Sequence, residues 1–259
     1  MSAEPAVVLI EGLRCVAGTR LLLDLPRLAV CAGERVVLVG SNGAGKSTLL
    51  RCLGGFATPA QGQVLVLGQT LPLRRQALRR LRADVGQVLQ GVHLVARLTV
   101  LENTLIGALG RLRGRQAWQS WWRRYPDADV AGAQQALQAV GLAGRDDERV
   151  DRLSGGERQK VAMARLLVQR PRLVLADEPT ASLDPAAARE ACALLGSAAE
   201  GATLISVVHD PALVPLLGTR VVGLRAGRLM FDRPAAEVDA AAWAALYAQP
   251  SPDGTMGAP

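Results

Sequence analysis

One stretch of the sequence decides the fold, and it reads Gly40-Ser41-Asn42-Gly43-Ala44-Gly45-Lys46-Ser47-Thr48. An apolar run at residues 35–39, predicted to be a strand, leads into this stretch, and a helical pattern follows from Ser47. Glycines at this spacing let successive backbone N–H groups point at one anion, and a helix N-terminus adds partial positive charge. The stretch therefore predicts a nucleotide-phosphate site, in which Lys46 contacts the β- and γ-phosphates and the Ser47 hydroxyl binds Mg²⁺.

A second group of residues places acids at the end of a predicted buried strand. Residues 173–176 are apolar, and Asp177 and Glu178 follow directly. An acid in this position is most often part of a turn or a helix cap. Beside a phosphate loop the same pattern favours a metal carboxylate. We therefore expect Asp177 to hold Mg²⁺ through water and Glu178 to polarise the attacking water.

Two further signals come from the second half of the chain. Ser154-Gly155-Gly156 opens a predicted helix, which is either another anion-binding helix N-terminus or a Ser-capped helix after a flexible turn. His209, one of two histidines, follows the apolar run 203–208. A lone histidine after a strand is usually structural. This one ends the strand that follows the Asp177 strand, which favours a catalytic role.

These strings together resemble the ATP-binding cassette (ABC) family, over residues 7–240. The resemblance implies that two copies close head-to-tail, with Ser154, Gly155 and Gly156 contacting the γ-phosphate held by the other copy. It further implies a Q-loop glutamine at Gln90, a D-loop at 182–184 and a switch histidine at His209. The implied cofactors are ATP and Mg²⁺. The implied catalytic residues are Glu178, His209 and Gln90, and the metal-binding residues are Ser47, Gln90 and Asp177.

The order of predicted elements indicates an α/β fold with a P-loop (RecA-like) core, an antiparallel β subdomain and an inserted α-helical subdomain. Strands are predicted at 7–10, 21–23, 28–30, 64–67 and 85–89, and helices at 99–109, 131–140 and 185–198. We expect one domain over 1–248. Within it, 1–90 and 155–232 form the nucleotide-binding core, 91–154 forms the helical subdomain, and 249–259 is a mobile C-terminal tail.

Composition excludes several classes of protein. Of the 259 residues, 49% are hydrophobic and 20% charged, which excludes a disordered chain. No signal peptide or membrane-spanning apolar run is apparent, so we expect any membrane role to pass through a partner. The four cysteines, scattered without metal-ligand spacing, predict free thiols in a reducing compartment.

The net charge of +7 raises the question of an anionic partner. Five arginines between residues 74 and 82 predict an amphipathic helix with a solvated basic face near a membrane headgroup. That interpretation is favoured over a nucleic-acid site, which would also want interleaved aromatic residues. Trp118, Trp121, Trp122 and Tyr125 follow in a helical stretch. We expect them to pack internally; a groove for a short helix of a membrane subunit is the alternative.

The string 97–107, Arg-Leu-Thr-Val-Leu-Glu-Asn-Thr-Leu-Ile-Gly, resembles the ATPase subunits of phosphonate importers. This resemblance implies import of phosphonate or a related oxyanion, a homodimer on the cytoplasmic face of the inner membrane, permease subunits, a solute-binding protein and no nucleic acid. Another ABC importer or exporter, a soluble cassette acting on nucleic acid, and an ATP-binding module without turnover remain open. One family feature is missing, because no adenine-stacking aromatic stands near Val16 and Ala17.

Overall fold

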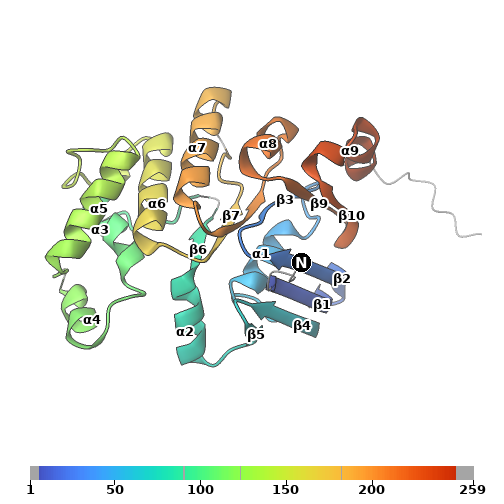
Figure 1. Ribbon diagram of the computed structural model, residues 1–259, viewed down its shortest axis with the longest axis horizontal. Coiled ribbons are helices and arrows are strands. Elements are labelled where there is room, and N and C mark those ends of the chain that lie inside the picture. The colour runs from blue at the N-terminus through green and yellow to red at the C-terminus, as the bar shows by residue number, and fades with distance from the viewer. Residues whose placement is uncertain (1–5, 90, 123, 182, 249–259) are drawn as a thin grey trace, which may run out of the picture.

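The computed structural model describes residues 6–89, 91–122, 124–181 and 183–248, and these form one ten-stranded sheet covered by helices (Figure 1). The strand order is β5-β4-β1-β2-β10-β9-β3-β8-β7-β6. A single residue pair, Arg228 with Asp24, joins β10 to β2. The sheet is therefore two parts, an antiparallel one at one end and a largely parallel one at the other.

The antiparallel part contains β1 (Ala6–Ala17), β2 (Arg20–Cys31), β4 (Gln61–Val66) and β5 (Gln69–Leu71). We predicted two short strands, 21–23 and 28–30, where the structure has the single strand β2, so that prediction is wrong. The interruption expected from Pro26 is absent because β2 is hydrogen-bonded along its length only to β1, and a proline fits a strand with one free edge.

The parallel part supplies the site. Its strands are β3 (Arg35–Val39), β6 (Val85–Val88), β7 (Leu173–Asp177), β8 (Thr203–Val207), β9 (Arg220–Arg225) and β10 (Arg228–Pro234). All but β10 run in the same direction, and β3 lies between β8 and β9. Nearly every residue of β3, β7 and β8 is buried, as expected for strands covered on both faces. Their carboxyl ends meet at one edge of the sheet, where α/β proteins bind ligands.

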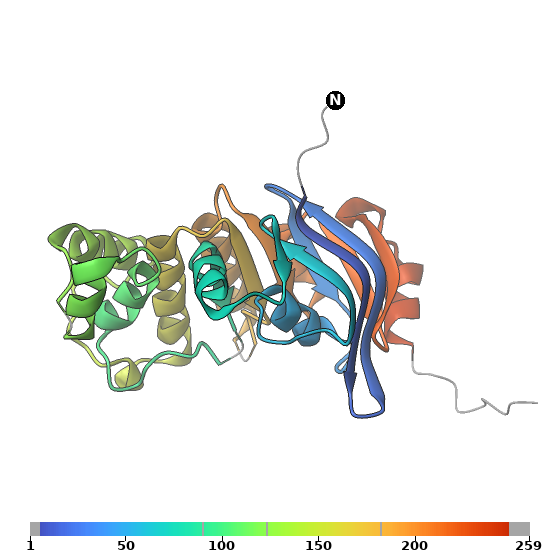
Figure 2. The same ribbon diagram turned by 90° about the horizontal axis from the view of Figure 1, so that it is seen from below.

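Helices cover both faces. The nine helices in the described part of the chain are α1 (Lys46–Leu53), α2 (Arg75–Asp84), α3 (Val100–Leu105), α4 (Gly114–Trp121), α5 (Asp127–Ala139), α6 (Gly155–Gln169), α7 (Pro185–Ala198), α8 (Val214–Leu217) and α9 (Ala240–Tyr247). Helix α1 packs on one face of β3 and β7, and α7 to α9 pack on the other. Helices α3 to α6 gather at the far end of the molecule from the antiparallel strands (Figure 2).

The predicted fold class is confirmed, and several helix bounds are close. The helix predicted at 185–198 is α7, and the one at 131–140 begins earlier, as α5. The helix predicted at 99–109 is α3 continued by a 3₁₀ turn, Ile106–Ala108. No helix of the described residues is both long and apolar enough to cross a membrane. The tail predicted at 249–259 lies outside the described residues.

Candidate functional site

The phosphate loop joins β3 to α1, and its backbone requires glycine. Gly40, Gly43 and Gly45 all have positive φ, at 146°, 78° and 101°. A Cβ at Gly40 would lie 2.0 Å from the Leu224 carbonyl oxygen, and one at Gly45 would lie 2.7 Å from the Leu22 carbonyl oxygen. The loop is thus wedged between β9 and β2. Helix α1 begins at Lys46, so its unpaired N–H groups face the loop.

Lys46 and Ser47 sit at the start of α1. The Lys46 ammonium is buried and donates to the carbonyl oxygens of Gly40, at 2.8 Å, and Ser41, at 3.0 Å. Burial lowers the pKa of Lys46, against the opposing effect of the nearby Glu178 and Asp177 carboxylates. The amine is therefore a desolvated charge held by neutral acceptors, and an anion in the loop would bind it strongly.

Asp177 lies at the end of β7, opposite Ser47. The Ser47 hydroxyl donates to Asp177 Oδ1 at 3.2 Å. Burial raises the pKa of Asp177, although the bond from Ser47 acts in the other direction. A hydroxyl and a carboxylate oxygen at this separation fit Mg²⁺, a hard cation that takes few protein ligands and completes its shell with water and phosphate.

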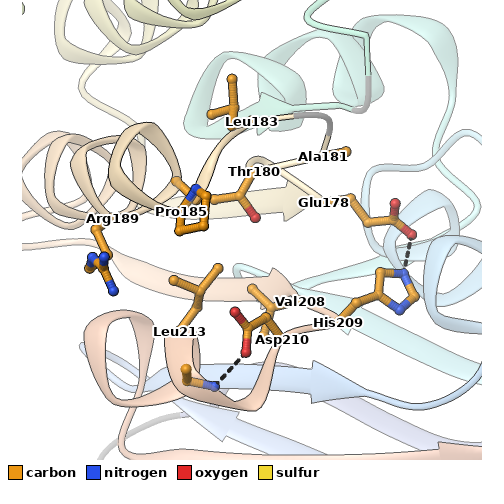
Figure 3. A pocket seen from close by; sticks show the side chains of 12 residues that line it. Glu178, Thr180, Ala181, Leu183, Pro185, Arg189, Val208, His209, Asp210 and Leu213 are labelled. Atoms are coloured by element: carbon orange, nitrogen blue, oxygen red, sulfur yellow. Dashed lines mark hydrogen bonds and ion pairs between the residues drawn. The ribbon is translucent and has the colours of Figure 1, made fainter.

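Glu178 and His209 follow adjacent strands, β7 and β8, and face each other (Figure 3). His209 Nε2 and Glu178 Oε1 are 2.6 Å apart. Glu178 has φ of 50°, an uncommon backbone for a non-glycine residue that often marks a functional site. A cavity of about 250 Å³ opens beside the pair, between the start of α7 and the segment after β8. The structure thus brings the two predicted catalytic side chains into contact.

The signature residues lie elsewhere on the chain, at the start of α6. Ser154 caps this helix: its hydroxyl accepts from Glu157 N–H at 3.3 Å, and the Glu157 carboxylate accepts from Ser154 N–H at 2.8 Å. That backbone bond, with the Arg145 guanidinium, lowers the pKa of Glu157 to about 2. A Cβ added at Gly155 or Gly156 would meet nothing within 4 Å. Within the described residues no hydrogen bond or ion pair joins 154–156 to the phosphate loop.

Two expected site residues cannot be placed. Gln90 and Ser182 lie outside the described residues. The remainder of the expected D-loop is described: Asp184 caps α7 by accepting from the N–H groups of Ala186 and Ala187. Asp184 therefore serves local structure in this chain.

Two residues near the loop were not predicted. A Cβ at Gly43 would lie 3.9 Å from Arg20 Nη2, so the Arg20 guanidinium is beside the phosphate loop. Burial raises the pKa of Tyr247, in α9, and the nearby backbone of Gly40 acts in the other direction. Val16 is 44% exposed, and no ring replaces the missing aromatic there. Nothing in the sequence analysis singled out Arg20.

The four cysteines are all free thiols, as predicted. Cys15 and Cys52 lie side by side with their sulfur atoms 3.4 Å apart, and burial raises the pKa of Cys52 to about 12. A thiol with so high a pKa holds almost no thiolate at neutral pH and is therefore unreactive.

The basic face is exposed, as predicted, at Arg74, Arg75, Arg79 and Arg80. Arg82 and two of the tryptophans differ from expectation. Arg82 does not belong to a solvated face: it donates to the Gly54 and Gly55 carbonyls and lies 3.9 Å over the Phe56 ring. Trp118 and Trp122 are 68% and 65% exposed, so for these two the prediction of internal packing is wrong. Helix α4 has too few neighbours at the end of the molecule to cover them.

Known proteins resemble this chain along most of its length. A family model described as "ABC transporter" matches residues 23–181. The "Phosphonates import ATP-binding protein PhnC" of Wolinella succinogenes is 40% identical over 235 residues, which cover 90% of this chain and 84% of that one. "PhnC 1" of Pseudomonas aeruginosa is 45% identical over 234 residues, covering 89% and 86%.

Solved structures agree. The structure of cbiO1 from Clostridium perfringens, part of an ABC transporter complex, has a TM-score of 0.77 at 27% identity and covers 91% of both chains. MJ0796, a bacterial ABC transporter cassette solved as a dimer, also has a TM-score of 0.77 at 27% identity, covering 88% of this chain and 98% of that one. Fold, site geometry and relatives lead to one conclusion: the chain belongs to the ABC transporter family.

Proposed function

We propose that this chain is the ATP-hydrolysing subunit of a membrane importer for phosphonate or a related phosphorus oxyanion. The observation that carries the ATPase assignment is the meeting of the phosphate loop with Asp177, Glu178 and His209 at one edge of the sheet. The solute comes from the names of relatives that are 40% and 45% identical. No group in the site itself selects a phosphonate.

Each residue of the site has a distinct role in this proposal. The backbone N–H groups of residues 40–48 and the Lys46 ammonium bind the β- and γ-phosphates of ATP, replacing the loop carbonyls that hold Lys46 here. Ser47 and Asp177 hold Mg²⁺, which neutralises phosphate charge when bound. Gln90 completes the metal site, so its position changes with the occupancy of that site and transmits the change to the rest of the chain.

Glu178 and His209 act as a pair. Glu178 orients the attacking water and accepts its proton, and His209 contacts the γ-phosphate. In the structure these two side chains are bonded to each other at 2.6 Å. Hydrolysis therefore requires the pair to open, so that the carboxylate faces water and the imidazole faces phosphate.

The second half of each ATP site comes from another copy of the chain. Ser154, Gly155 and Gly156 form an exposed helix N-terminus with open space above both glycines, which suits an anion that arrives from outside. Two copies in head-to-tail contact would complete two sites across one twofold axis. The similarity to a cassette solved as a dimer supports this arrangement.

The membrane partner docks at the helical end. A groove of about 440 Å³ lies between α2 and the segment 106–120, and its lining includes Arg79, Leu109 and Arg165. Ser120 of α4 also lines the groove, and the exposed Trp118 and Trp122 lie on and just after the same helix. Large exposed aromatics mark interaction surfaces, so we assign this groove to a short helix of the permease.

The same proposal includes the location of the chain, its partners and the motion of its subdomains. It is peripheral on the cytoplasmic face of the inner membrane, and a solute-binding protein delivers the oxyanion to the permease. The helical subdomain predicted over 91–154 is extended by α6, which packs against α3 and α5, and this unit moves against the rest of the nucleotide-binding core. Nucleic acid is not a partner.

Three substitutions test the assignment. Glu178→Gln should still bind ATP, accumulate as an ATP-bound dimer in size-exclusion chromatography, and lose hydrolysis. Ser154→Arg should bind ATP as a monomer and fail to hydrolyse it, whereas Lys46→Ala should lose binding. Normal hydrolysis by Glu178→Gln would refute the role of Glu178. Ser154→Arg binding ATP no better than Lys46→Ala would refute the role of a second copy.

A further inference from the structure

Asn103, in α3, is a fully buried polar residue that holds the segment following Gln90. Its Oδ1 accepts from Val95 N–H at 2.9 Å, and its Nδ2 donates to the carbonyls of Val95, at 3.1 Å, and Thr99, at 3.0 Å. With a further bond to the Leu98 carbonyl at 3.4 Å, the amide side chain binds four backbone groups within residues 95–99. Leaving any of them unpaired in this buried position would be costly, so the segment is fixed to α3.

Arg165 reaches the same place from the signature helix α6. Its Nε donates to the Asn103 carbonyl at 3.0 Å, its Nη2 to Asn103 Oδ1 at 3.1 Å, and its Nη1 to the His93 carbonyl at 3.4 Å. Burial lowers the pKa of Arg165 to about 10, and no ion pair of the described residues includes it. Because the Arg165 guanidinium has no carboxylate partner among the described residues, its role is not charge pairing. Its rigid fork instead joins α6 to both α3 and the segment after Gln90.

Helix α6 carries this connection to the signature residues. Arg165 stands three turns along the helix that Ser154 caps, a distance of about 16 Å at 1.5 Å per residue. Helix α6 packs closely against the turn at Gly107, because a Cβ at Gly107 would lie 2.3 Å from the Arg165 carbonyl oxygen. A helix of this length moves as a rod, so a shift at Arg165 also appears at Ser154.

A second set of bonds joins the same segments by another route. Val100 N–H donates to the Glu148 carbonyl at 2.8 Å, and Leu101 N–H donates to the Asp146 carbonyl at 3.1 Å. Residues 146–153 lead directly into Ser154. The beginning of α3 is therefore attached to the signature residues both through Arg165 and through the preceding loop.

We propose that Asn103 and Arg165 form a brace that makes the segment 91–98 and the signature helix move as one body. Through the brace, the position of the Gln90 segment sets how Ser154 meets the ATP of the other copy. Both are positioning residues, and the inference rests on the proposed two-copy ATPase. Arg165 also lines the groove assigned to the membrane partner, so a helix docked there presses on the brace itself.

The test uses Arg165→Lys in the full chain, which keeps a positive charge but loses the fork. Hydrogen exchange at the Val95 amide, whose acceptor is Asn103, reports on the brace. We expect this amide to exchange about tenfold faster or more. We also expect kcat for ATP to fall about tenfold while KM stays within about twofold, because the phosphate loop is untouched and only the delivery of Ser154 is impaired.

Arg111→Lys is the matched control. Arg111 also bonds to α6, at the Val168 carbonyl, and to Asp129, but neither bond involves a residue of 91–98. It should leave Val95 exchange and kcat unchanged. Asn103→Leu is a second variant in case Arg165→Lys fails to fold. It removes the acceptor for Val95 N–H and Arg165 and the donors to the Val95 and Thr99 carbonyls, and should raise exchange and lower kcat in the same sense.

Unchanged Val95 exchange in folded Arg165→Lys, confirmed by circular dichroism, would overturn the brace. Faster exchange with unchanged kcat would also overturn it, because the contact would then position nothing. Absence of ATP hydrolysis by the wild-type chain would refute the proposed function instead. The exchange measurement does not depend on hydrolysis, so the two failures are distinguishable.

Discussion

Gly156→Asp separates the effect of the signature on the stability of the single chain from its effect on contact with a second copy. Gly156 lies in the first turn of α6, and a Cβ there meets nothing within 4 Å. Replacing glycine in a helix gains about 0.3 kcal/mol of propensity for Asp. A carboxylate near a helix N-terminus adds about 0.3–1 kcal/mol. The substitution should therefore stabilise the folded chain and raise its midpoint of thermal unfolding by about 1–5 °C.

The effect on hydrolysis should have the opposite sign. If the γ-phosphate bound by the other copy approaches Gly156, the new carboxylate faces a like charge at about 4 Å. At an effective dielectric constant of about 20 that repulsion is about 4 kcal/mol. Each 1.4 kcal/mol is a factor of about ten, so ATP-driven dimerisation should weaken by about a thousandfold. Hydrolysis should fall with it, while ATP binding to the single chain stays unchanged.

Three measurements check this. Circular dichroism gives the unfolding midpoint, titration calorimetry gives ATP binding, and size-exclusion chromatography in a Glu178→Gln background gives dimer formation. Gly156→Asn is the uncharged control and should lose much less dimer. Gly132→Asp adds the same carboxylate at an equally open glycine of α5, and should leave hydrolysis unchanged. Normal dimerisation and hydrolysis by a folded Gly156→Asp would refute the reasoning.

Two further predictions concern stability and pH. Ser206 is fully buried in β8, and its hydroxyl has no hydrogen-bond partner among the described residues, so Ser206→Ala should raise the free energy of unfolding by about 1–2 kcal/mol. Thr203→Val, in the same strand, should lower the free energy of unfolding, because the Thr203 hydroxyl accepts a hydrogen bond from Gly33 N–H. Chemical denaturation measures the free energy of unfolding of both variants. A lower value for Ser206→Ala than for the wild type would contradict the account. The raised pKa of Asp177 means that its charged form opposes folding, a cost absent below the ordinary carboxyl pKa and fully felt above the raised one. At pH 7 without nucleotide, Asp177→Asn should therefore unfold at a higher temperature yet lose Mg²⁺-dependent hydrolysis; a lower midpoint would show that Asp177 stabilises the fold.

Local sequence determined the parts of the structure that local chemistry controls. The phosphate loop could be predicted because glycines spaced this closely between a strand and a helix, with Lys46 after the last of them, suit an anion-binding turn. Helix α7 could be predicted because Asp184 and Pro185 mark its start, as the observed cap confirms. Glu178 and His209 could be identified as site residues because each follows an apolar strand, but their hydrogen bond to each other was not predicted.

Features that depend on tertiary neighbours could not be predicted. Whether Trp118 is buried depends on what packs on α4, and amphipathic spacing alone cannot show that α4 is left exposed at the end of the molecule. We predicted Arg82 to be a solvated charge. In the structure it binds the carbonyls of the two glycines that follow α1 and lies over the Phe56 ring. Asn103 resembles an ordinary polar helix residue in the sequence. Its role emerges only when residues 91–98 and Arg165 close around it.

The central claim is that each ATP site is shared by two chains, and mixing two inactive variants tests it most directly. Lys46→Ala lacks phosphate binding but has an intact signature, and Ser154→Arg has the reverse. In a mixed dimer, one site joins the intact Lys46 of one chain to the intact Ser154 of the other. Neither variant completes a site with its own copies, so the ATP-bound dimers in an equimolar mixture are mixed ones, and each keeps one of its two sites. Hydrolysis should then return to at most about half of the wild-type rate per chain. Mixed dimers that form but hydrolyse no ATP would contradict the account.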